Sequence, residues 1–387
     1  MRFPEFNGEW ETKLINDLAV VIGGGTPDTT IKSYWDGEIQ WFTPSEIGKN
    51  KYVDSSLRTI TEEGLNNSSA KLLPPNTILL SSRATIGECS LSLRECATNQ
   101  GFQSLVSKKC YVDFLYYLIQ TKKRDLIRKS CGSTFLEISA NEVRKIQVSV
   151  PTDVEQQKIA GLLSLIDERI ATQNKIIEDL KKLKSAISKY LFARKDLLET
   201  TICLSNIATL KNGYAFQSGK YNALGKWKIL TITNVPGERY INDEDCNCII
   251  NLPNDIQDHQ VLKEGDILIS LTGNVGRVSL CKNGNYLLNQ RVGLLQLAKN
   301  VNQEFLYQIL SSQRFENSMI ACGQGAAQMN IGKGDVENYV LPYSSNGNNI
   351  LFAAKILHSY DECIINELRR LTLLTMQKQY LLTQMFI

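Results

Sequence analysis

The sequence predicts an α+β fold in which a globular domain followed by a long helix occurs twice. Three observations predict this class. A long stretch with helical periodicity follows Val150, a second stretch of the same kind fills residues 350–387, and short motifs of the first half recur in the second half at nearly constant spacing. Colinear recurrence of this kind indicates an internal repeat. We therefore expect two similar globular domains separated by two long antiparallel helices.

The first long helix is predicted between Val150 and Arg194. Pro151 can open a helix but could not lie inside one, and no further proline follows before residue 194. Apolar residues recur at steps of three and four with charged residues between them, so one face is buried. Such a helix is about 55 Å long, which suits a spacer or a coiled coil. Its apolar stripe comprises Ile159, Leu162, Leu163, Ile166, Ile170, Ile177, Leu180, Leu183, Ile187 and Leu191.

The second long helix is predicted over residues 350–387, which have the same periodicity and no proline or glycine. Residues 166–168 correspond to residues 360–362, at an offset of 194. Each helix needs a partner for its apolar face, so we predict that the two pack antiparallel along these faces. The second stripe comprises Ile356, Leu357, Ile364, Leu368, Leu371, Leu374, Leu381 and Met385.

The first domain is predicted to be a series of short strands with helices near its two ends. Glycine- and proline-rich turns separate runs of β-branched and apolar residues, which is typical of strands. The expected elements are a short helix at 10–20, strands at 39–42, 77–81 and up to 105, a helix at 112–129 and a strand at 146–150.

The second domain repeats this order, beginning with a short helix at 204–210. Residues 47–73 and 235–262 do not align, whereas the motifs on either side of them do. Duplication could have been kept for stability alone, but divergent loops on a shared frame suit two recognition units with different targets. The matched pairs are 77–81 with 266–270, Asn99-Gln100 with Asn289-Gln290, and 114–116 with 305–307, at offsets of 189, 190 and 191.

Composition excludes several classes of protein. A net charge of +3 permits a nucleic-acid partner without requiring one. No apolar run is long enough to cross a membrane and the first residues do not form a signal peptide, so we expect a cytoplasmic protein. The ten cysteines contain no CxxC motif, which indicates reduced thiols. Cys246 and Cys248 form the only close pair, and a metal or redox role for them is a minor hypothesis.

Catalytic motifs are missing from the sequence. There is no phosphate-binding P-loop, no GxGxxG opening a strand–helix unit, no GxSxG and no HExxH. The two histidines, His259 and His358, are expected to be structural, and Asp28 with Glu38 makes only a weak carboxylate pair. We therefore expect a non-catalytic chain that holds neither metal nor cofactor.

The order of domain and helix, together with several motifs, resembles the specificity (S) subunit of type I restriction-modification systems. The most specific part joins the end of the first domain to the first helix and is similar to the central conserved region of that family. Other motifs are similar to the family's recognition domains. The residues that carry the resemblance are Val150-Pro151, 155–159 and 167–168, then 24–27, 34–37, Trp41, 213–216, 266–270, Gly273, Gly276 and Asn289-Gln290.

The resemblance implies a DNA-reading subunit whose two target-recognition domains each read one part of a bipartite, asymmetric target in double-stranded DNA. The helices would fix the length of the unread spacer. Two methyltransferase (M) subunits would dock on the helices, and restriction (R) subunits would join for cleavage. S-adenosylmethionine, ATP and Mg²⁺ would belong to those partners. The implied boundaries are 1–150 and 197–343 for the recognition domains, 151–196 for the central helix and 344–387 for the C-terminal helix.

The second helix departs from the family pattern, because residues 343–349 stand where the first helix has Glu155, Gln156 and Gln157. If that motif seats an M subunit, the second docking site is expected to be weaker or differently shaped. The candidates for M-subunit contact are Glu155, Gln156, Gln157, Lys158, Lys181, Lys182 and Lys184; the last three could equally form a solvated face.

DNA contacts are expected in the loops that follow the aligned strands. Lysine and arginine would bind phosphates, and polar side chains would read base edges. Arg83 and Arg277 could instead only brace their loops. The candidates are Thr43, Ser45, Lys49, Lys51, Arg83 and Thr85 in the first domain, and Thr231, Asn234, Arg239, Thr272, Asn274 and Arg277 in the second.

Two other functions remain open on the sequence. The chain could be a coiled-coil scaffold that binds other proteins, which its modest charge mildly favours. It could also be an S-like subunit of a related system in which methylation and cleavage share one partner polypeptide. DNA binding that weakens steeply with salt would argue against the scaffold.

Overall fold

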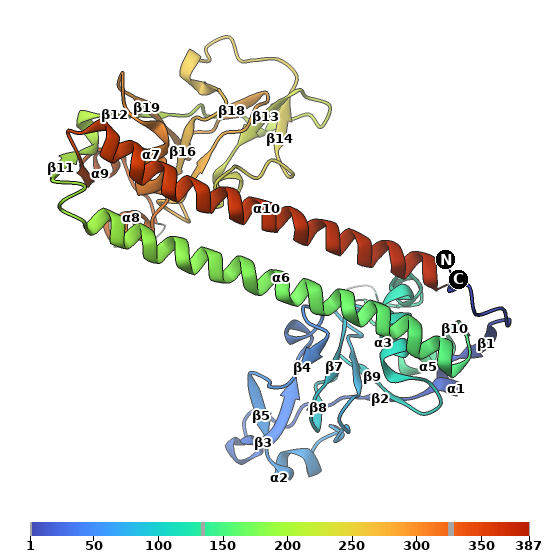
Figure 1. Cartoon of the computed structure of the whole chain (residues 1–387). Helices are drawn as coiled ribbons and strands as arrows, with labels where there is room; N and C mark the ends of the chain where they lie inside the picture. The colour runs from blue at the N-terminus through green and yellow to red at the C-terminus, as the bar shows by residue number, and fades with distance from the viewer. Residues whose placement is uncertain (1, 133–135, 324–328, 387) are drawn as a thin grey trace. The chain divides into compact units, whose positions relative to one another are not determined.

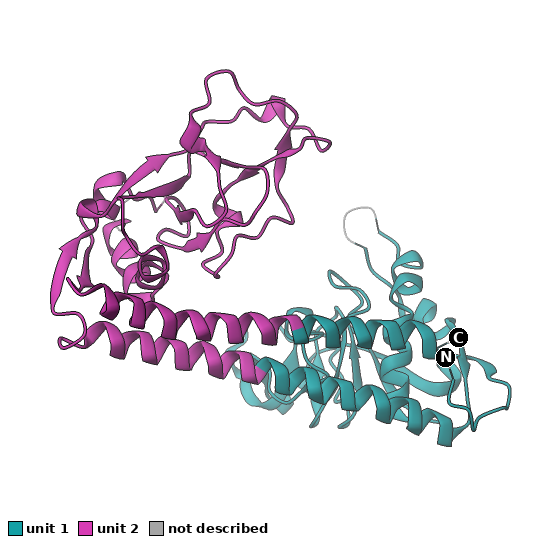
Figure 2. Ribbon diagram, turned by 45° about the horizontal axis from the view of Figure 1, so that its top comes forward, with its two compact units in different colours: residues 1–174, 370–387 teal, residues 175–369 magenta. Residues whose placement is uncertain are grey.

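A computed structural model of the chain describes residues 2–132, 136–323 and 329–386. The chain divides into two compact units, one made of residues 1–174 and 370–387 and the other of residues 175–369 (Figure 2). Each unit contains one globular domain and a part of each of two long helices (Figure 1). The predicted fold class, α+β with two similar domains and two long helices packed together, is confirmed.

The two long helices are α6 (Asp153–Ala193) and α10 (Gly347–Met385). In the first unit the N-terminal half of α6 packs with the C-terminal half of α10, and in the second unit the opposite halves pack, so the helices are antiparallel. Most of the predicted stripe is buried or half-buried, as the apolar period requires. Leu183 is the exception, because it is 46% exposed.

The first domain contains two sheets, with strand orders β2-β9-β6-β7-β4 and β5-β3-β8. The strands β1 and β10 lie at the two ends of the domain and pair antiparallel with each other. Its elements are β1 (Glu11–Leu14), α1 (Ile15–Leu18), β2 (Ala19–Gly23), β3 (Trp35–Phe42), β4 (Tyr52–Val53), β5 (Arg58–Ile60), α2 (Glu62–Asn66), β6 (Ile78–Leu80), β7 (Cys89–Ser92), β8 (Cys96–Thr98), β9 (Gln103–Ser107), α3 (Val112–Thr121), α4 (Lys123–Arg128), α5 (Ala140–Arg144) and β10 (Gln147–Val150).

The second domain has matching sheets, with strand orders β12-β19-β16-β17 and β14-β13-β18-β15, and β11 pairs with β20 at its ends. In each domain the central strand of the second sheet has one parallel neighbour, β8 beside β3 and β18 beside β13. Its elements are β11 (Thr200–Cys203), β12 (Ala208–Asn212), β13 (Trp227–Leu230), β14 (Asn247–Ile249), β15 (Val261–Leu262), β16 (Ile267–Ser270), β17 (Val278–Leu280), β18 (Tyr286–Leu288), β19 (Val292–Leu297), α7 (Gln303–Leu310), α8 (Gln313–Gly323), α9 (Lys333–Glu337) and β20 (Val340–Tyr343).

The short helices predicted at 10–20 and 204–210 are wrong. The first segment forms β1, the four-residue α1 and β2, and the second forms a 3-10 turn at Leu204–Asn206 followed by β12. Pairing with distant strands decides the outcome, because β2 lies against β9 and β12 against β19. Ladder hydrogen bonds to strands far along the chain outweigh a weak local helical period.

Each domain shares its core with its part of the helix pair. In the first unit Phe114 and Leu115 of α3 belong to one buried cluster with Leu163 of α6 and Leu381 of α10. In the second unit Phe305 of α7 belongs to one cluster with residues of both long helices, among them Leu191 and Leu357. The helices therefore complete the cores of the domains.

Candidate nucleic-acid interface

Three loops of the first domain meet at the ends of its central strands. Thr43–Glu46 follows β3, Ser81–Gly87 follows β6, and Asn99–Gly101 follows β8. The backbone N–H of Ser82 donates to the carbonyl oxygen of Gly101 at 2.8 Å, and that of Asn99 donates to the carbonyl oxygen of Phe42 at 3.0 Å. These bonds bring together loops that are separate in the sequence.

The second domain builds the same arrangement. Residues 231–234 follow β13, residues 270–276 follow β16, and residues 289–291 follow β18. The N–H of Leu271 donates to the carbonyl oxygen of Arg291 at 3.0 Å, and that of Asn289 to the carbonyl oxygen of Leu230 at 3.2 Å. Each domain thus has its own three-loop surface, built in the same way as that of the other domain. The side chains on these surfaces can differ without a change of backbone.

The first loop is held by a side-chain cap in both domains. Thr43 donates its N–H to Glu46 Oε2 at 2.7 Å, and its hydroxyl oxygen lies 3.0 Å from that of Ser45. Thr231 repeats this with Asn234 Oδ1 at 2.8 Å and the hydroxyl of Thr233 at 2.9 Å. In both turns the side chain three residues further on accepts the N–H of the threonine, and each domain presents two adjacent hydroxyls.

The second loop has the same backbone in both domains although its side chains differ. Ala84 has φ 55° and Gly273 has φ 69°, both in the left-handed region, at positions 189 residues apart. Gly276 is required in the second domain, since it has φ 77° and a Cβ there would lie 2.6 Å from Met319 Cβ. The turn is therefore part of the frame, and Arg83, Thr85, Thr272 and Asn274 are the variable side chains on it.

Most predicted DNA contacts lie on this surface or near it. Ser45, Lys49, Thr85 and Asn274 are exposed, and Thr43, Arg83, Thr231, Thr272 and Arg277 are half-buried. Arg83 pairs with Glu137 at 2.9 Å, and Arg277 lies 3.5 Å from Glu316. Both arginines are half-exposed and brace their loops while keeping part of the guanidinium open to solvent.

Three predicted contacts point into the protein instead. Asn234 is 3% exposed and donates to the carbonyl oxygen of Asn242 at 2.9 Å. The side chains of Lys51 and Arg239 are 7% and 8% exposed and are held by carboxylates of α3 and α7, respectively. Burial with internal partners favours a structural role for all three.

Two exposed arginines were missed by the sequence analysis. Arg58 opens β5, and its guanidinium carbon lies 3.5 Å from the centroid of the Trp35 ring. Arg291 follows Asn289-Gln290 and occupies the position of Gly101 in the first domain. The aligned Asn-Gln pair could have pointed to Arg291, whereas only the strand pairing of β5 with β3 places Arg58.

The start of α6 is a structural anchor. The carboxylate of Glu155 is 1% exposed and accepts two bonds from Arg2, both at 2.7 Å. Gln156 is 2% exposed, and its Oε1 accepts the N–H of Tyr111 at 2.9 Å. Gln157 and Lys158 are exposed. Of these four side chains, therefore, only those of Gln157 and Lys158 reach solvent, and the ammonium of Lys158 is engaged by Glu5.

The start of α10 is anchored by different groups. Asn349, which corresponds to Glu155, donates to the carbonyl oxygen of Leu197 at 3.0 Å. Glu199 accepts the N–H of Ser345 at 2.7 Å, and hydrogen bonds from its own backbone N–H and from that of Ser345 lower the pKa of Glu199 to about 2. Amide and hydroxyl groups thus replace the Glu–Gln–Gln motif as anchors.

The predicted lysines of α6 have different surroundings. Lys181 and Lys182 are exposed, with Glu238 at 3.8 Å and Glu178 at 2.5 Å, respectively. Lys184 is largely buried and lies 2.6 Å from Asp361 of α10.

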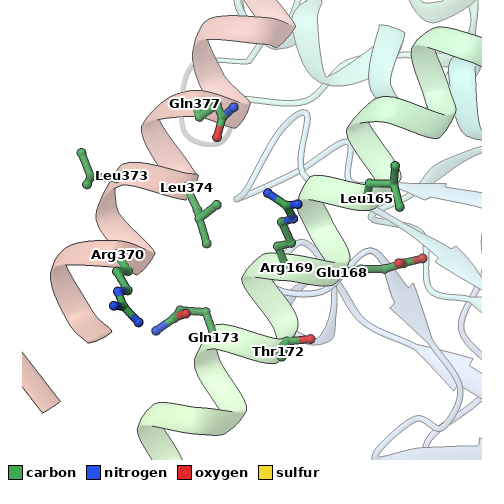
Figure 3. A pocket seen from close by; sticks show the side chains of 9 residues that line it. All are labelled: Leu165, Glu168, Arg169, Thr172, Gln173, Arg370, Leu373, Leu374 and Gln377. Atoms are coloured by element: carbon green, nitrogen blue, oxygen red, sulfur yellow. The ribbon is translucent and has the colours of Figure 1, made fainter. Parts of the chain in front are cut away.

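An open groove of about 630 Å³ lies between the helices in the first unit (Figure 3). Leu165 and Leu373 on its rim are 58% and 64% exposed. Figure 3 shows Arg169 and Leu374 pointing into the space between the two helices. Single exposed leucines are ordinary on a protein surface, whereas an open groove flanked by them is a candidate for a protein contact.

The close cysteine pair has no metal-site geometry. Among the residues that the structure describes, no three His, Cys, Asp or Glu side chains are placed to hold a metal ion. Burial raises the pKa of Cys246 to about 11, and its sulfur accepts a bond from Asn234 at 3.3 Å. Cys246 therefore stays a protonated thiol at neutral pH. No helix within the described ranges is both long and apolar enough to span a membrane.

The fold and these loops define a class of protein, an internally repeated two-domain chain that presents polar loops and carries its domains on a helix pair. Comparison with known proteins then places it. The family model described as type I restriction modification DNA specificity domain matches residues 7–182 and again residues 199–375. The chain belongs to this family and carries its domain twice. The resemblance to type I specificity subunits that the sequence indicates is confirmed at the level of the family.

Several relatives carry the same description. The MjaIX specificity subunit of Methanocaldococcus jannaschii is 39% identical over 189 residues, which cover 48% of this chain and 44% of that protein. The EcoR124I/EcoR124II specificity subunit of Escherichia coli is 31% identical over 206 residues, 51% of this chain and 50% of that protein. The chain thus matches about half the length of these two relatives. The MjaVIII subunit of M. jannaschii is 24% identical over 344 residues, 82% of this chain and 78% of that protein.

Solved structures support the fold. A type I restriction-modification S subunit from M. genitalium aligns with a TM-score of 0.57 at 18% identity, over 100% of this chain and 99% of that one. A chain from a structure concerned with complex assembly of the type I system aligns with a TM-score of 0.60 at 14% identity, over 98% of each.

Proposed function

We propose that this chain is the DNA specificity subunit of a type I restriction-modification complex and that it works in the cytoplasm without chemistry of its own. One observation carries the proposal. Two domains of a DNA-specificity family present the same three-loop surface with different side chains. A shared frame with divergent polar groups suits the reading of two different half-sites.

The proposed boundaries are 1–150 and 197–343 for the target-recognition domains, with 151–196 and 344–387 as the two helical segments. The pairing of β1 with β10 and of β11 with β20 supports them, because each pair joins the beginning of a domain to its end. Each domain would then be a module inserted between helices, reading one half of the target.

We propose two kinds of DNA contact on the three-loop surfaces. Arg58, Lys49 and Arg291 supply positive charge for phosphates or guanine edges. Hydroxyl and amide groups supply hydrogen bonds to base edges and the backbone. The proposed polar contacts are Thr43, Ser45, Thr85, Thr231 and Asn274, with Arg83 and Arg277 at the loop bases; Thr272 is not retained, because its hydroxyl oxygen is buried. Lys51, Asn234 and Arg239 are not retained as contacts, because their side chains are buried with internal partners.

Two methyltransferase subunits are proposed to dock on the helices. The groove with Leu165 and Leu373 supports this in the first unit, together with the exposed Gln157 and Lys158 at the start of α6. Lys181 and Lys182 of α6 are exposed cations in the second unit. Restriction subunits would join this complex. S-adenosylmethionine, ATP and Mg²⁺ would be bound by the partner subunits.

The proposal is tested by mapping methylated adenines in the host genome with this gene intact and deleted. We expect one bipartite motif to lose its methylation on deletion and to regain it when the gene is restored. An unchanged map in cells that express the chain and its methyltransferase partner would overturn the proposal and would favour a protein scaffold.

A further inference from the structure

A buried network of charged and polar groups joins the first domain to both long helices. Lys51 Nζ lies 2.5 Å from Asp113 Oδ1 of α3 and donates to Ser164 Oγ of α6 at 2.7 Å. On the same helix Asp167 accepts the hydroxyl of Tyr117 at 2.6 Å and pairs with Lys378 of α10 at 2.7 Å. The side chains of Asp167 and Lys378 are only 15% and 20% exposed.

The second domain is joined to the helices by an equivalent network. The guanidinium of Arg239 binds both oxygens of Glu304 at 2.9 and 2.7 Å and Asp361 Oδ2 at 3.0 Å. Asp361 of α10 also pairs with Lys184 of α6 at 2.6 Å, and Gln308 Nε2 donates to it at 2.6 Å. The side chains of Arg239 and Asp361 are both 8% exposed.

The two networks occupy matching positions of the repeat. Each contains a cation from the segment that follows the first of the three loops, which itself follows β3 or β13. Each also contains a carboxylate at the start of α3 or α7, and an Asp–Lys pair between α6 and α10. The roles of the helices are exchanged between the pairs, since Asp167 and Lys184 lie on α6 whereas Lys378 and Asp361 lie on α10. The correspondences are Lys51 with Arg239 at an offset of 188, Asp113 with Glu304 at 191, and Asp167 with Asp361 and Lys184 with Lys378 at 194.

Burying these charges is not an efficient way to gain stability. A buried ion pair roughly breaks even against an apolar pair of similar size, because desolvation offsets the attraction. Its better-attested effect is to select one packing arrangement, since any arrangement that leaves one charge buried and unpaired is strongly destabilised. Leucine seams alone tolerate slippage, and a buried polar group can select one register.

We propose that the two networks are register keys, which hold each recognition domain at one position along its part of the helix pair and so restrict the complex to one spacer length. This inference rests on the proposed function. A one-turn slide of either helix would separate Lys378 from Asp167 or Lys184 from Asp361 and leave a buried carboxylate short of a partner. Lys184 and Lys378 are therefore positioning residues, although neither would touch DNA.

The test replaces both lysines by methionine, in the double variant Lys184→Met/Lys378→Met. Arg239 and Gln308 still bind Asp361, and Tyr117 still binds Asp167, so no carboxylate is left without a partner. The full chain, assembled with its methyltransferase, is given DNA duplexes that carry the genomic half-sites with spacers of the native length and one base pair shorter or longer. We expect the variant to keep both half-sites and to raise methylation of the altered spacers at least tenfold relative to the native one.

Three further variants separate register from stability. Lys184→Arg/Lys378→Arg keeps both pairs and should keep the wild-type spacer preference. Lys189→Met removes an exposed lysine of the same helix that is not part of the proposed docking surfaces, and it should also leave the spacer preference unchanged. If the double variant unfolds at a much lower temperature than the wild-type chain, the single variant Lys184→Met replaces it in the spacer assay.

The outcomes separate the inference from the proposed function. A folded methionine variant with the wild-type spacer preference overturns the register keys and leaves the specificity role standing. A wild-type chain that directs no methylation to any bipartite motif overturns both. Lost stability without a change in spacer preference also overturns the register keys, since a merely structural pair would behave in that way.

Discussion

At the scale of single residues, the molecule separates frame from recognition. The frame residues of the loops are side chains that accept a turn N–H and left-handed positions, such as Glu46, Asn234 and Gly276. The recognition candidates are side chains that leave this frame toward solvent, such as Arg58 and Arg291. Substitutions in the two groups should therefore have different effects, one on stability and the other on DNA binding.

We predict that Arg58→Ala and Arg291→Ala each weaken binding of the genomic target duplex. The expected loss of binding free energy is about 1–3 kcal/mol for a base contact. Loss of a phosphate contact would also reduce the slope of the logarithm of affinity against the logarithm of salt concentration by about one. Fluorescence anisotropy over a range of salt concentrations measures both. Arg94→Ala is the control, because the guanidinium of this exposed arginine is engaged by Asp54 at 2.7 and 2.8 Å. Equal losses in all three variants would contradict the assignment.

We predict that Gly276→Ala destabilises the second domain by about 2–4 kcal/mol, because a left-handed alanine and an overpacked contact with Met319 both cost free energy. Thermal unfolding followed by circular dichroism measures the change. Gly347→Ala is the control, because Gly347 is the first residue of α10 and a Cβ added there would have no atom within 4 Å. A similar loss in both variants would mean that the geometry at Gly276 is not the cause.

At the scale of elements, side chains join neighbouring strands and helices where the sheets are short. Asp243 accepts bonds from Lys228 of β13 at 2.7 Å, from Lys282 at 3.0 Å and from Tyr286 of β18 at 3.1 Å. The hydrogen bond from Lys228, with those from Lys282 and Tyr286, holds the pKa of Asp243 well below its usual range although partial burial opposes this. The loop that carries Asp243 is thereby fixed to the second sheet.

We predict that the contribution of Asp243 to stability depends on pH. A carboxylate whose pKa is lowered by folding stabilises the protein above its unfolded-state pKa of about 3.9, and this stabilisation fades as pH falls below about 5. Asp243→Asn should cost about 1–3 kcal/mol at pH 7 and progressively less below pH 4. Urea unfolding at pH 7 and pH 3.5 measures this, with the exposed Asp245→Asn as control. A difference from wild type that is independent of pH would contradict it.

We predict that Leu165→Asp and Leu373→Asp reduce association with the methyltransferase subunit while the chain stays folded. Both side chains are more than half exposed, so the substitutions cost little in the free chain but place a charge in the proposed interface. Copurification of the tagged chain with its partner measures the effect. Leu224→Asp is the control, because Leu224 is 90% exposed on a loop of the second domain. Undiminished copurification would place the docking surface elsewhere.

At the scale of the whole molecule, the chain is two copies of one plan with different chemistry at matching positions. Lys51 corresponds to Arg239 and Tyr117 to Gln308, and in both cases the carboxylate partner occupies the matching position although the groups differ. The repeat therefore conserves positions and partners more than residue types. An internally repeated protein with unlike copies suits a target with unlike halves.

We predict that the two recognition surfaces act on different halves of the target. With duplexes randomised in one half-site at a time, Arg58→Ala should relax selection in one half only and Arg291→Ala in the other. Sequencing of methylated products measures the selection. Relaxation of the same half by both variants would contradict the assignment of one half-site to each domain.

Sequence reasoning succeeded where the signal was long or repeated. The two helices follow from their apolar period, and the equivalence of the domains follows from motifs such as Asn99-Gln100 and Asn289-Gln290. It failed at residues 10–20, where pairing with β9 and β10 decides the local structure. It also failed for Lys51 and Arg239, because a charged residue in a loop gives no sign of the carboxylate that will bury it. Their equivalence appears only in the structure, where the carbonyl oxygens of Lys51 and Arg239 accept the N–H groups of Leu91 and Leu280, because the segments around them do not align in sequence.

The composition of the first unit has a consequence for synthesis of the chain. Its core includes Leu381, Leu382 and Met385, which follow the entire second unit in the sequence. On the ribosome the first domain must therefore wait, with part of its apolar surface uncovered, until residues beyond 380 have emerged. The second unit is complete once residue 369 is made. We expect the domain that is translated first to be the last to mature, and the nascent first domain to depend on chaperones more than the second.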